Sequence, residues 1–193
     1  MPAPTRCTAL LDACVLYPLA MTDALLSLAT AGLFAAKWTV RIEQEWIYAL
    51  ETRRPALAGK LVTRRDSMRD AILDWEVPEK AWQAVAREIQ LPDPNDVHVL
   101  AAAIAGKANC IVTSNLKDFP STTVNAYAID VIDPDTFICQ QLDQQTAAAI
   151  SAFKRMRGRR KKPHATATDF AQAIDLGGLP NTAERLRQSI DLI

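Results

Sequence analysis

The sequence predicts an α/β fold with a central parallel sheet, followed by a helical C-terminal extension. Two segments, residues 8–15 and 110–113, are almost wholly apolar, which is typical of strands buried on both faces of a parallel sheet. Segments with helical periodicity lie between them, and only helices are predicted after residue 140. We therefore expect a domain over residues 1–140 and an extension over residues 141–193 of this 193-residue chain.

The first predicted strand carries an acid near its end. Residues 8–15 read Thr-Ala-Leu-Leu-Asp-Ala-Cys-Val, and Asp12 is the only charged side chain among them. An ionised carboxylate there is costly unless it is paired, hydrogen-bonded or bound to a metal ion. The alternative is that Asp12 caps the turn that follows at Tyr17-Pro18.

Helices are predicted next, the first capped by Thr22 and ending at Gly32 and the second capped by Thr39. Glu43 and Glu45 lie on opposite flanks of the apolar face of the second helix, and periodicity does not choose between them. A third helix is predicted from Pro55 and a fourth from Pro78 through Val85. Five arginines lie in or near the third: Arg53, Arg54, Arg64, Arg65 and Arg69. We interpret them as a solvated charged face, with phosphate contacts as the alternative.

The stretch Leu91–Pro120 holds the densest group of polar signals. Pro92 and Pro94 favour extended backbone before a helix that starts near Asp96 and ends at Gly106. Asp96 stands in the first turn of that helix, where a carboxylate is also favoured as a simple cap. The strand at residues 110–113 follows, and a polar loop holding Asn115, Lys117 and Asp118 comes after it.

The last part of the chain is predicted to be one more strand at residues 127–132 and then helices. These start at Pro134, span 141–157, and close the chain at about 168–176 and 182–190. The segment 154–162 holds seven basic residues and no acidic one, so the other residues carry a net charge of −7. This basic run is interpreted either as a contact for RNA phosphates or as a solvated linker.

Composition excludes several classes of protein. No apolar run approaches the roughly 18 residues of a membrane helix, and no apolar segment follows Arg6 as in a secretory signal, so a cytoplasmic protein without membrane contact is expected. The four cysteines form no Cys-x-x-Cys pair and are interpreted as small core residues rather than zinc ligands. The nucleophile elbow, the phosphate-binding loop and the dinucleotide fingerprint are all missing from the sequence.

Three carboxylates are predicted to meet at one edge of the sheet. Asp12 ends one strand, Asp96 opens the helix before another, and Asp118 follows that second strand with Asn115 beside it. A glutamate of the second helix can reach the same place. Converging carboxylates repel one another, so a cation is the natural way to keep them ionised. Oxygen ligands suit Mg²⁺ or Mn²⁺, and such ions serve phosphoryl chemistry.

With these residues in place, the sequence resembles the PIN-domain ribonucleases, most closely the VapC-type toxins of bacterial toxin–antitoxin pairs. The resemblance covers roughly residues 7–140. It is carried by three segments: Leu10-Leu-Asp12-Ala-Cys-Val-Leu-Tyr-Pro18, Ile42-Glu-Gln-Glu45-Trp46, and Leu91–Pro120 with Asp93-Pro-Asn-Asp96-Val-His98 and Thr113-Ser-Asn115-Leu-Lys-Asp118 inside it.

The resemblance implies a three-layer α/β/α PIN-like domain and a metal-dependent endoribonuclease acting on RNA. Its first three catalytic acids match Asp12, Glu45 and Asp96, with Mg²⁺ or Mn²⁺ held by Asp12 and Asp96. Many members carry Asp where this chain has Asn115, so Asp118 either takes the fourth acidic place or braces the loop.

Further expectations concern the residues near these acids and the partners of the chain. Thr113 is expected to orient an acid or the substrate. Val97 stands where close relatives often have Arg, which removes one phosphate contact. The family further implies a VapB-like antitoxin and a homodimer.

Two other functions stay open at this point. A phosphatase with Asp12 as nucleophile is disfavoured because Cys14 stands where a second acid is needed. A PIN module that binds RNA or a protein without cleaving it is favoured by the neutral Asn115.

Overall fold

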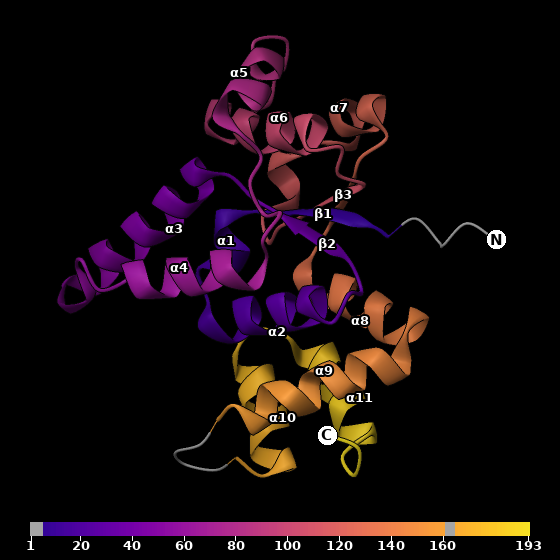
Figure 1. Ribbon diagram of the computed structural model, residues 1–193. Coiled ribbons are helices and arrows are strands. Elements are labelled where there is room, and N and C mark those ends of the chain that lie inside the picture. Colours follow the sequence, from indigo (N-terminus) through magenta and orange to yellow (C-terminus); the bar gives the residue numbers. More distant parts are fainter. Residues whose placement is uncertain (1–5, 161–164) are drawn as a thin grey trace. The chain divides into compact units, whose positions relative to one another are not determined.

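The computed structural model describes residues 6–160 and 165–193 (Figure 1). Contacts divide the chain into two compact units. We call the first the sheet unit; it contains the residues up to Tyr17 together with Phe34–Asp133. The second, the helical unit, combines Pro18–Leu33 with Pro134–Ile193.

The sheet unit is built on four parallel strands in the order β2-β1-β3-β4. They are β1 (Thr8–Leu11), β2 (Ala35–Lys37), β3 (Cys110–Val112) and β4 (Asp130–Ile132). Ala9 is opposite both Ala36 and Cys110, and Ile111 is opposite Val131. All four strands run in one direction, so their carboxyl ends share one edge. The predicted α/β fold with a central parallel sheet is confirmed.

Helices of the sheet unit connect the strands and flank the sheet. They are α1 (Ala13–Leu16), α3 (Val40–Arg53), α4 (Val62–Ala71), α5 (Glu79–Ala86), α6 (Val97–Ala105) and α7 (Ser121–Val124). Four 3-10 turns join them, at Pro55–Leu57, Pro94–Asp96, Leu116–Asp118 and Asn125–Tyr127. In Figure 1, α5, α6 and α7 lie above the sheet, while α3 and α4 run side by side at its left. The strand ends thus open toward loops between these helices.

Local capping explains where these elements begin. Thr39 caps α3 as predicted, accepting a hydrogen bond from the Ile42 amide at 3.1 Å. The strand predicted to reach residue 15 ends at Leu11, because the Asp12 carboxylate accepts from the Ala13 amide and starts α1. The helix predicted from Pro55 is interrupted at Gly59, whose φ of +71° is not helical, and α4 begins only at Val62.

Strand β2 was not predicted from the sequence. Its three residues, Ala35–Lys37, are too few to show a period, and two of them are alanine. The strand exists because β1 supplies its hydrogen bonds, including one from the Ala35 amide to the Cys7 carbonyl at 2.8 Å. Tertiary pairing therefore overrides weak local preference here.

The core of the sheet unit consists of strand residues and the small residues of α6. Leu10, Leu11, Ile111 and Val112 are fully buried, as are the α6 residues 100–103 (Leu-Ala-Ala-Ala). Small side chains let this helix lie close to the strands. The helix ends at a glycine as predicted, where a Cβ would stand 2.8 Å from Val77 Cγ2. Close packing thus requires a glycine at the end of α6, just before β3.

The helical unit contains α2 (Leu19–Thr30), α8 (Pro134–Gln144), α9 (Thr146–Gly158), α10 (Ala167–Leu176) and α11 (Pro180–Gln188). The helical C-terminal extension is confirmed. Thr22 was predicted to cap α2, but it lies inside the helix and donates to the Pro18 carbonyl at 2.9 Å. The segment predicted as one helix from 141 to 157 is divided between α8 and α9. The domain boundary at residue 140 stays a proposal.

Polar bonds tie the helical unit together across long stretches of chain. Arg159 of the basic run donates to Asp23 at 2.5 Å and to Ser27 at 2.8 Å, which joins the end of α9 to α2. Asp135 is buried and accepts from the Asn181 and Thr182 amides, each at 2.8 Å, so it caps the start of α11. These contacts explain why α2 groups with helices far along the chain.

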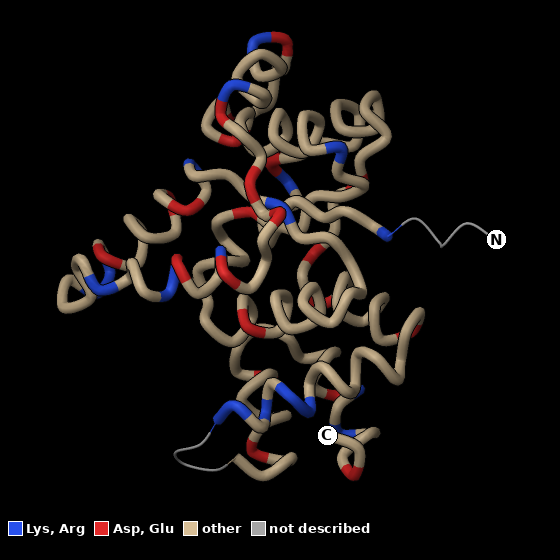
Figure 2. Tube along the Cα trace, viewed as in Figure 1, with Lys and Arg blue, Asp and Glu red and all other residues tan. Residues whose placement is uncertain are grey.

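The basic run is partly engaged within the helical unit. Figure 2 shows basic residues following one another along the last turns of α9. Arg155 donates to Ser151 at 2.8 Å, and Arg160 lies over the Phe170 ring at 5.2 Å. Lys161 and Lys162 lie outside the described residues. A simple solvated linker is therefore wrong for the described part, which belongs to a packed helix end, and contact with RNA stays a prediction.

The cysteines and the hydropathy of the helices bear on two further expectations. Cys110 is buried, as predicted for a small core residue, whereas Cys7, Cys14 and Cys139 are partly exposed. All four are free thiols. Among the described residues, no helix combines the length and the apolar character needed to cross a membrane.

Candidate active site

The site begins at Asp12, the residue directly after β1. Its side chain is only 5% exposed. Oδ1 accepts from the Ala13 amide at 2.6 Å, and Oδ2 accepts from the Thr113 hydroxyl at 2.7 Å and from the Cys14 thiol at 3.2 Å. These donors are all neutral. Asp12 is therefore held firmly in a buried position, but its negative charge is not neutralised by a Lys or Arg among the described residues.

Thr113 joins the ends of β1 and β3. The residue is fully buried, and its hydroxyl donates to Asp12 while accepting from the Asn115 amide at 3.0 Å. The predicted supporting residue thus contacts the predicted acid directly. Through the same oxygen it also fixes the start of the loop that carries Asn115.

Asp96 stands at the N-terminus of α6 but does not cap it. No capping hydrogen bond is formed by its side chain, whereas Asp93 accepts from the Asn95 amide at 2.8 Å and caps the preceding turn. The simple capping interpretation of Asp96 is therefore wrong. Burial and the negative charges of Asp12, Asp118 and Asp93 raise the pKa of Asp96 to about 6. The carboxylates are close enough to repel one another, as the sequence predicted.

The polar loop after β3 places its two candidate residues differently. Asn115 is exposed and lines the cavity described below. Asp118 lies one turn further on, half-buried, and does not line that cavity, although its charge acts on Asp96. The geometry therefore gives Asn115 the position at the cavity wall and leaves Asp118 as a nearby source of negative charge.

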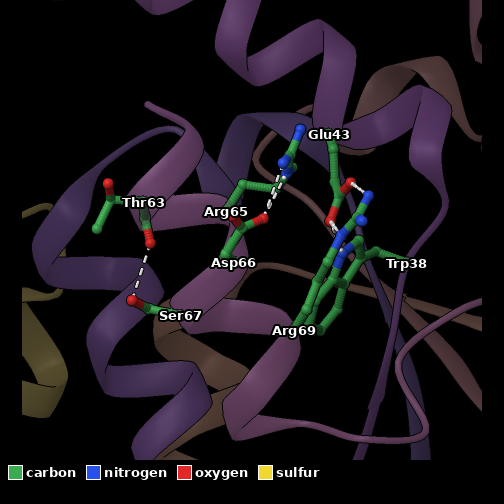
Figure 3. A network of polar contacts seen from close by, with 7 residues as sticks. All are labelled: Trp38, Glu43, Thr63, Arg65, Asp66, Ser67 and Arg69. Atoms are coloured by element: carbon green, nitrogen blue, oxygen red, sulfur yellow. Dashed lines mark hydrogen bonds and ion pairs between the residues drawn. The ribbon is translucent and has the colours of Figure 1, made fainter. Parts of the chain in front are cut away.

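Helix α3 carries two glutamates with different surroundings. Glu43 is 1% exposed and accepts from Trp38 Nε1 at 2.9 Å and from Arg69 Nε at 3.0 Å (Figure 3). A second nitrogen of Arg69 pairs with the other carboxylate oxygen. Arg69 also lies over the Trp75 ring, at 4.6 Å from its centroid. We call Trp38, Glu43, Arg69 and Trp75 the Glu43 cluster; its role is to join α3 to α4.

Glu45 faces the opposite way and reaches the site. Its Oε1 accepts from His98 Nε2 at 2.9 Å and from Arg41 Nε at 3.2 Å. His98 is buried, and no partner for its Nδ1 is found among the described residues. Packing thus makes the choice between the two glutamates that periodicity left open: Glu45 lines the cavity and Glu43 does not.

These side chains border one cavity of about 410 Å³ within the sheet unit. We call it the acidic cavity. It is lined by Asp12, Ala13, Cys14, Tyr17, Glu45, Trp46, Ala49, Arg53, Asp96 and Asn115. Asp12, Glu45 and Asp96 are its three carboxylates, whereas Asp118, which was predicted to meet Asp12 and Asp96 at this edge of the sheet, does not line it. Burial and the charge of Asp12 also raise the pKa of the Cys14 thiol to about 11, another sign of negative potential.

Sequence analysis did not single out every residue of the cavity wall. Tyr17 and Trp46 were named only within a turn and within the segments that carry the resemblance. Arg53 was one of five arginines interpreted as a solvated face, with phosphate contacts as the alternative. The solvated-face interpretation is wrong for Arg64 and Arg69, which are bonded inside the unit.

Comparison with known proteins identifies both parts of the chain. The family model of the PIN domain matches residues 8–117, more than half of the chain, and that of the VapC50 C-terminal domain matches residues 134–188. A stretch of 48 residues is 50% identical to a protein of Mycobacterium tuberculosis (strain ATCC 25618 / H37Rv) named "Putative ribonuclease VapC50". That stretch is 25% of this chain and spans 28% of the relative's length.

Proposed function

The chain belongs to the PIN-domain family, and from that premise we propose that it is a metal-dependent endoribonuclease that hydrolyses RNA phosphodiester bonds. One observation carries the proposal. Asp12 and Asp96 line the same cavity at the carboxyl ends of parallel strands, and neither forms an ion pair with Lys or Arg in the described part of the chain. Uncompensated carboxylates in a partly buried cavity call for a cation.

The donor set of the acidic cavity fits Mg²⁺ or Mn²⁺. Asp12 and Asp96 would hold the ion through carboxylate oxygens, which such hard cations prefer. Within residues 6–160 and 165–193, no three His, Cys, Asp or Glu side chains form a metal-binding group. Mg²⁺ needs only one or two protein carboxylates, because it keeps several of its waters. When bound, the ion supplies Lewis acidity toward a nucleophilic water and toward the phosphodiester.

The protein's own residues divide the remaining work. Thr113 donates a 2.7 Å hydrogen bond to the Asp12 carboxylate and so fixes the orientation of that carboxylate. Glu45 is oriented through Oε1 by His98, and its Oε2 accepts no hydrogen bond from the described residues. We assign that oxygen to take the proton of the attacking water, directly or through a second water. Asn115 is assigned to hydrogen-bond the substrate, and Asp118 to brace the loop.

The test is cleavage of a mixed pool of structured RNAs by the purified full chain. Discrete fragments are expected with Mg²⁺ or Mn²⁺, and none with EDTA or with Asp96→Asn. Asp130→Asn is the matched control, because Asp130 begins β4 at the opposite edge of the same sheet and is exposed. Cleavage that survives both EDTA and Asp96→Asn would overturn the proposal.

A second function is favoured by one observation. Asn115 stands on the cavity wall without a charge, so the cavity has one carboxylate fewer than a fully acidic site. A PIN module that binds RNA or a protein without cutting it would show binding but no metal-dependent fragments. In that case Asn115→Asp is the first change to make, and recovered cleavage would identify the missing group.

We also propose that the chain is the cytoplasmic toxin of a VapBC-like pair, with a VapB-like antitoxin and a homodimeric state. Support comes from the C-terminal match to the VapC50 C-terminal domain. Expression of the chain alone should arrest growth, and expression of Asp96→Asn should not. Light scattering of the purified protein gives the number of subunits.

A further inference from the structure

One wall of the acidic cavity carries a tyrosine and an arginine instead of carboxylates. The Tyr17 ring lines the cavity at the end of α1, and Arg53 lines it at the end of α3. The guanidinium carbon of Arg53 lies over the Tyr17 ring, 5.8 Å from its centroid. An aromatic face and a cation thus stand together within the same cavity as Asp12, Asp96 and Glu45.

Arg53 differs from Arg41, Arg65 and Arg69 of α3 and α4. Arg41 pairs with Glu45, Arg65 with Asp66, and Arg69 with Glu43. Arg53 pairs with no carboxylate in the described part of the chain, and it is the only Lys or Arg on the cavity wall. A cation that faces an acidic cavity without forming an ion pair is available to a negatively charged ligand.

The backbone at Tyr17 is held in place by the half-buried guanidinium of Arg64. Arg64 donates through Nη2 to the Leu16 carbonyl at 2.7 Å and through Nη1 to the Tyr17 carbonyl at 3.3 Å. Its guanidinium lies 4.7 Å from the Trp46 ring centroid, and burial lowers its pKa. Arg64 therefore serves as an internal brace rather than a ligand contact. It fixes the backbone position from which the Tyr17 side chain reaches the cavity wall.

We propose that Tyr17 and Arg53 form a nucleotide subsite for single-stranded RNA, in which the base beside the cleaved phosphodiester stacks on Tyr17 and Arg53 binds the adjoining phosphate. This inference rests on the proposed function. A base can stack on an aromatic side chain only when it is not stacked in a duplex, so the subsite selects unpaired nucleotides. Arg53 offsets the repulsion between the RNA backbone and the carboxylates of the cavity.

Kinetics of RNA cleavage separate this role from a structural one. Tyr17→Leu should raise KM about 10-fold and leave kcat nearly unchanged, because stacking is a binding contribution of this order. Tyr17→Phe should behave as wild type, since the ring is kept. Arg53→Gln should raise KM. It should also make the slope of log kcat/KM against log salt concentration less steep, by somewhat less than one, because one phosphate contact is lost. Arg54→Gln is the matched control, because Arg54 does not line the cavity.

A binding measurement keeps the subsite separate from cleavage. The probe is a dye-labelled single-stranded RNA oligonucleotide in Mg²⁺, titrated with Asp96→Asn protein and followed by fluorescence anisotropy. Adding Tyr17→Leu should weaken binding about 10-fold. The same change should have no effect on an RNA whose contacting nucleotide lacks its base, since the contact is then already lost.

The outcomes distinguish the two proposals. Binding that depends on Tyr17 without any cleavage by wild type supports the subsite and overturns the nuclease. Cleavage and binding that do not respond to Tyr17→Leu or Arg53→Gln overturn the subsite alone. If Tyr17→Leu unfolds, as judged by circular dichroism, Tyr17→Phe and Arg53→Gln are compared instead. An equal loss of RNA binding in these two variants would overturn stacking on Tyr17. Binding by no variant overturns both proposals.

Discussion

The Glu43 cluster and the acidic cavity both contain a glutamate from α3, yet they treat negative charge in opposite ways. In the Glu43 cluster, one buried carboxylate accepts hydrogen bonds from Trp38 and Arg69, and Arg69 neutralises its charge. In the acidic cavity, Asp12 is bonded only to neutral donors and Asp96 has a pKa raised to about 6.

The presence or absence of a cationic partner separates structural from functional acids in this protein. A buried carboxylate with a cationic partner stabilises the fold around it, and breaking that pair exposes the cost of a buried charge. Carboxylates that converge without a cationic partner destabilise the folded protein when no ligand is bound. Such carboxylates therefore indicate a binding or catalytic site. Burial by itself does not discriminate, because Glu43 and Asp12 are both almost fully buried.

The largest expected effect is loss of cleavage in the acidic cavity. Asp12→Asn should lower the single-turnover rate about a thousandfold, because it removes an ion ligand while keeping a side chain of the same shape. Far-ultraviolet circular dichroism should match that of wild type. Full metal-dependent cleavage by the variant would show that Asp12 does not belong to the catalytic site, and its contrast with Glu43 would no longer hold.

The second effect belongs to the Glu43 cluster and concerns stability. Glu43→Gln should lower the free energy of unfolding by about 3 kcal/mol, the low end for breaking a buried pair, because Arg69 retains some contact with solvent. Urea denaturation measures this change. The matched variant Glu45→Gln should change stability by about 1 kcal/mol or less and should instead slow cleavage. Equal destabilisation by both variants would contradict the distinction.

A third effect is stabilisation of the protein by a metal ion bound in the acidic cavity. Mg²⁺ at about 100 times its dissociation constant should raise the free energy of unfolding by about 2.7 kcal/mol. Asp96→Asn should lose this gain and, in EDTA, be slightly more stable than wild type, since one repelling charge is gone. Thermal unfolding with and without EDTA tests both points. Equal Mg²⁺ stabilisation of the variant would place the ion elsewhere.

The smallest effect is a difference between two thiols. A hydrogen bond from Cys110 lowers the pKa of Cys7 to about 7, whereas burial and Asp12 raise that of Cys14 to about 11. Only the thiolate is alkylated, so labelling of Cys7 by iodoacetamide should rise through about pH 7 while Cys14 stays unlabelled until strongly alkaline pH. Mass spectrometry of peptides reads both sites. Early labelling of Cys14 would argue against negative potential in the cavity.

The sequence was sufficient for the strands that meet the site and for the order of the acids. Apolar runs predicted β1 and β3, and Thr39 predicted the start of α3, because these signals are local. Asp12 was predicted near the end of the first strand and Asp96 in the first turn of the helix before the next strand, and these places brought both to one edge of the sheet. The roles of these residues, and of Glu45 and Asp118, stay proposals until the variants are measured.

Other features were decided only by tertiary structure. Strand β2 depends on β1 for its hydrogen bonds, and α2 joins the helical unit through contacts such as Asp23 with Arg159. No local pattern contains either partner. In the same way, Tyr17 and Arg53 are 36 positions apart in the sequence and meet only when α1 and α3 pack within the sheet unit.

Strand and helix signals depend on residues close along the chain. They were therefore sufficient to predict an α/β fold that brings acids to one edge of its sheet. Which acids keep an uncompensated charge was decided by the fold. Asp12 and Asp96 keep it, whereas Glu43 pairs with Arg69 and Glu45 with Arg41. The two glutamates are two positions apart, and only the packing of α3 against Arg69 on one side and His98 on the other decides that Glu45 lines the cavity. Charge compensation requires partners distant in sequence, so it is a property of the tertiary structure.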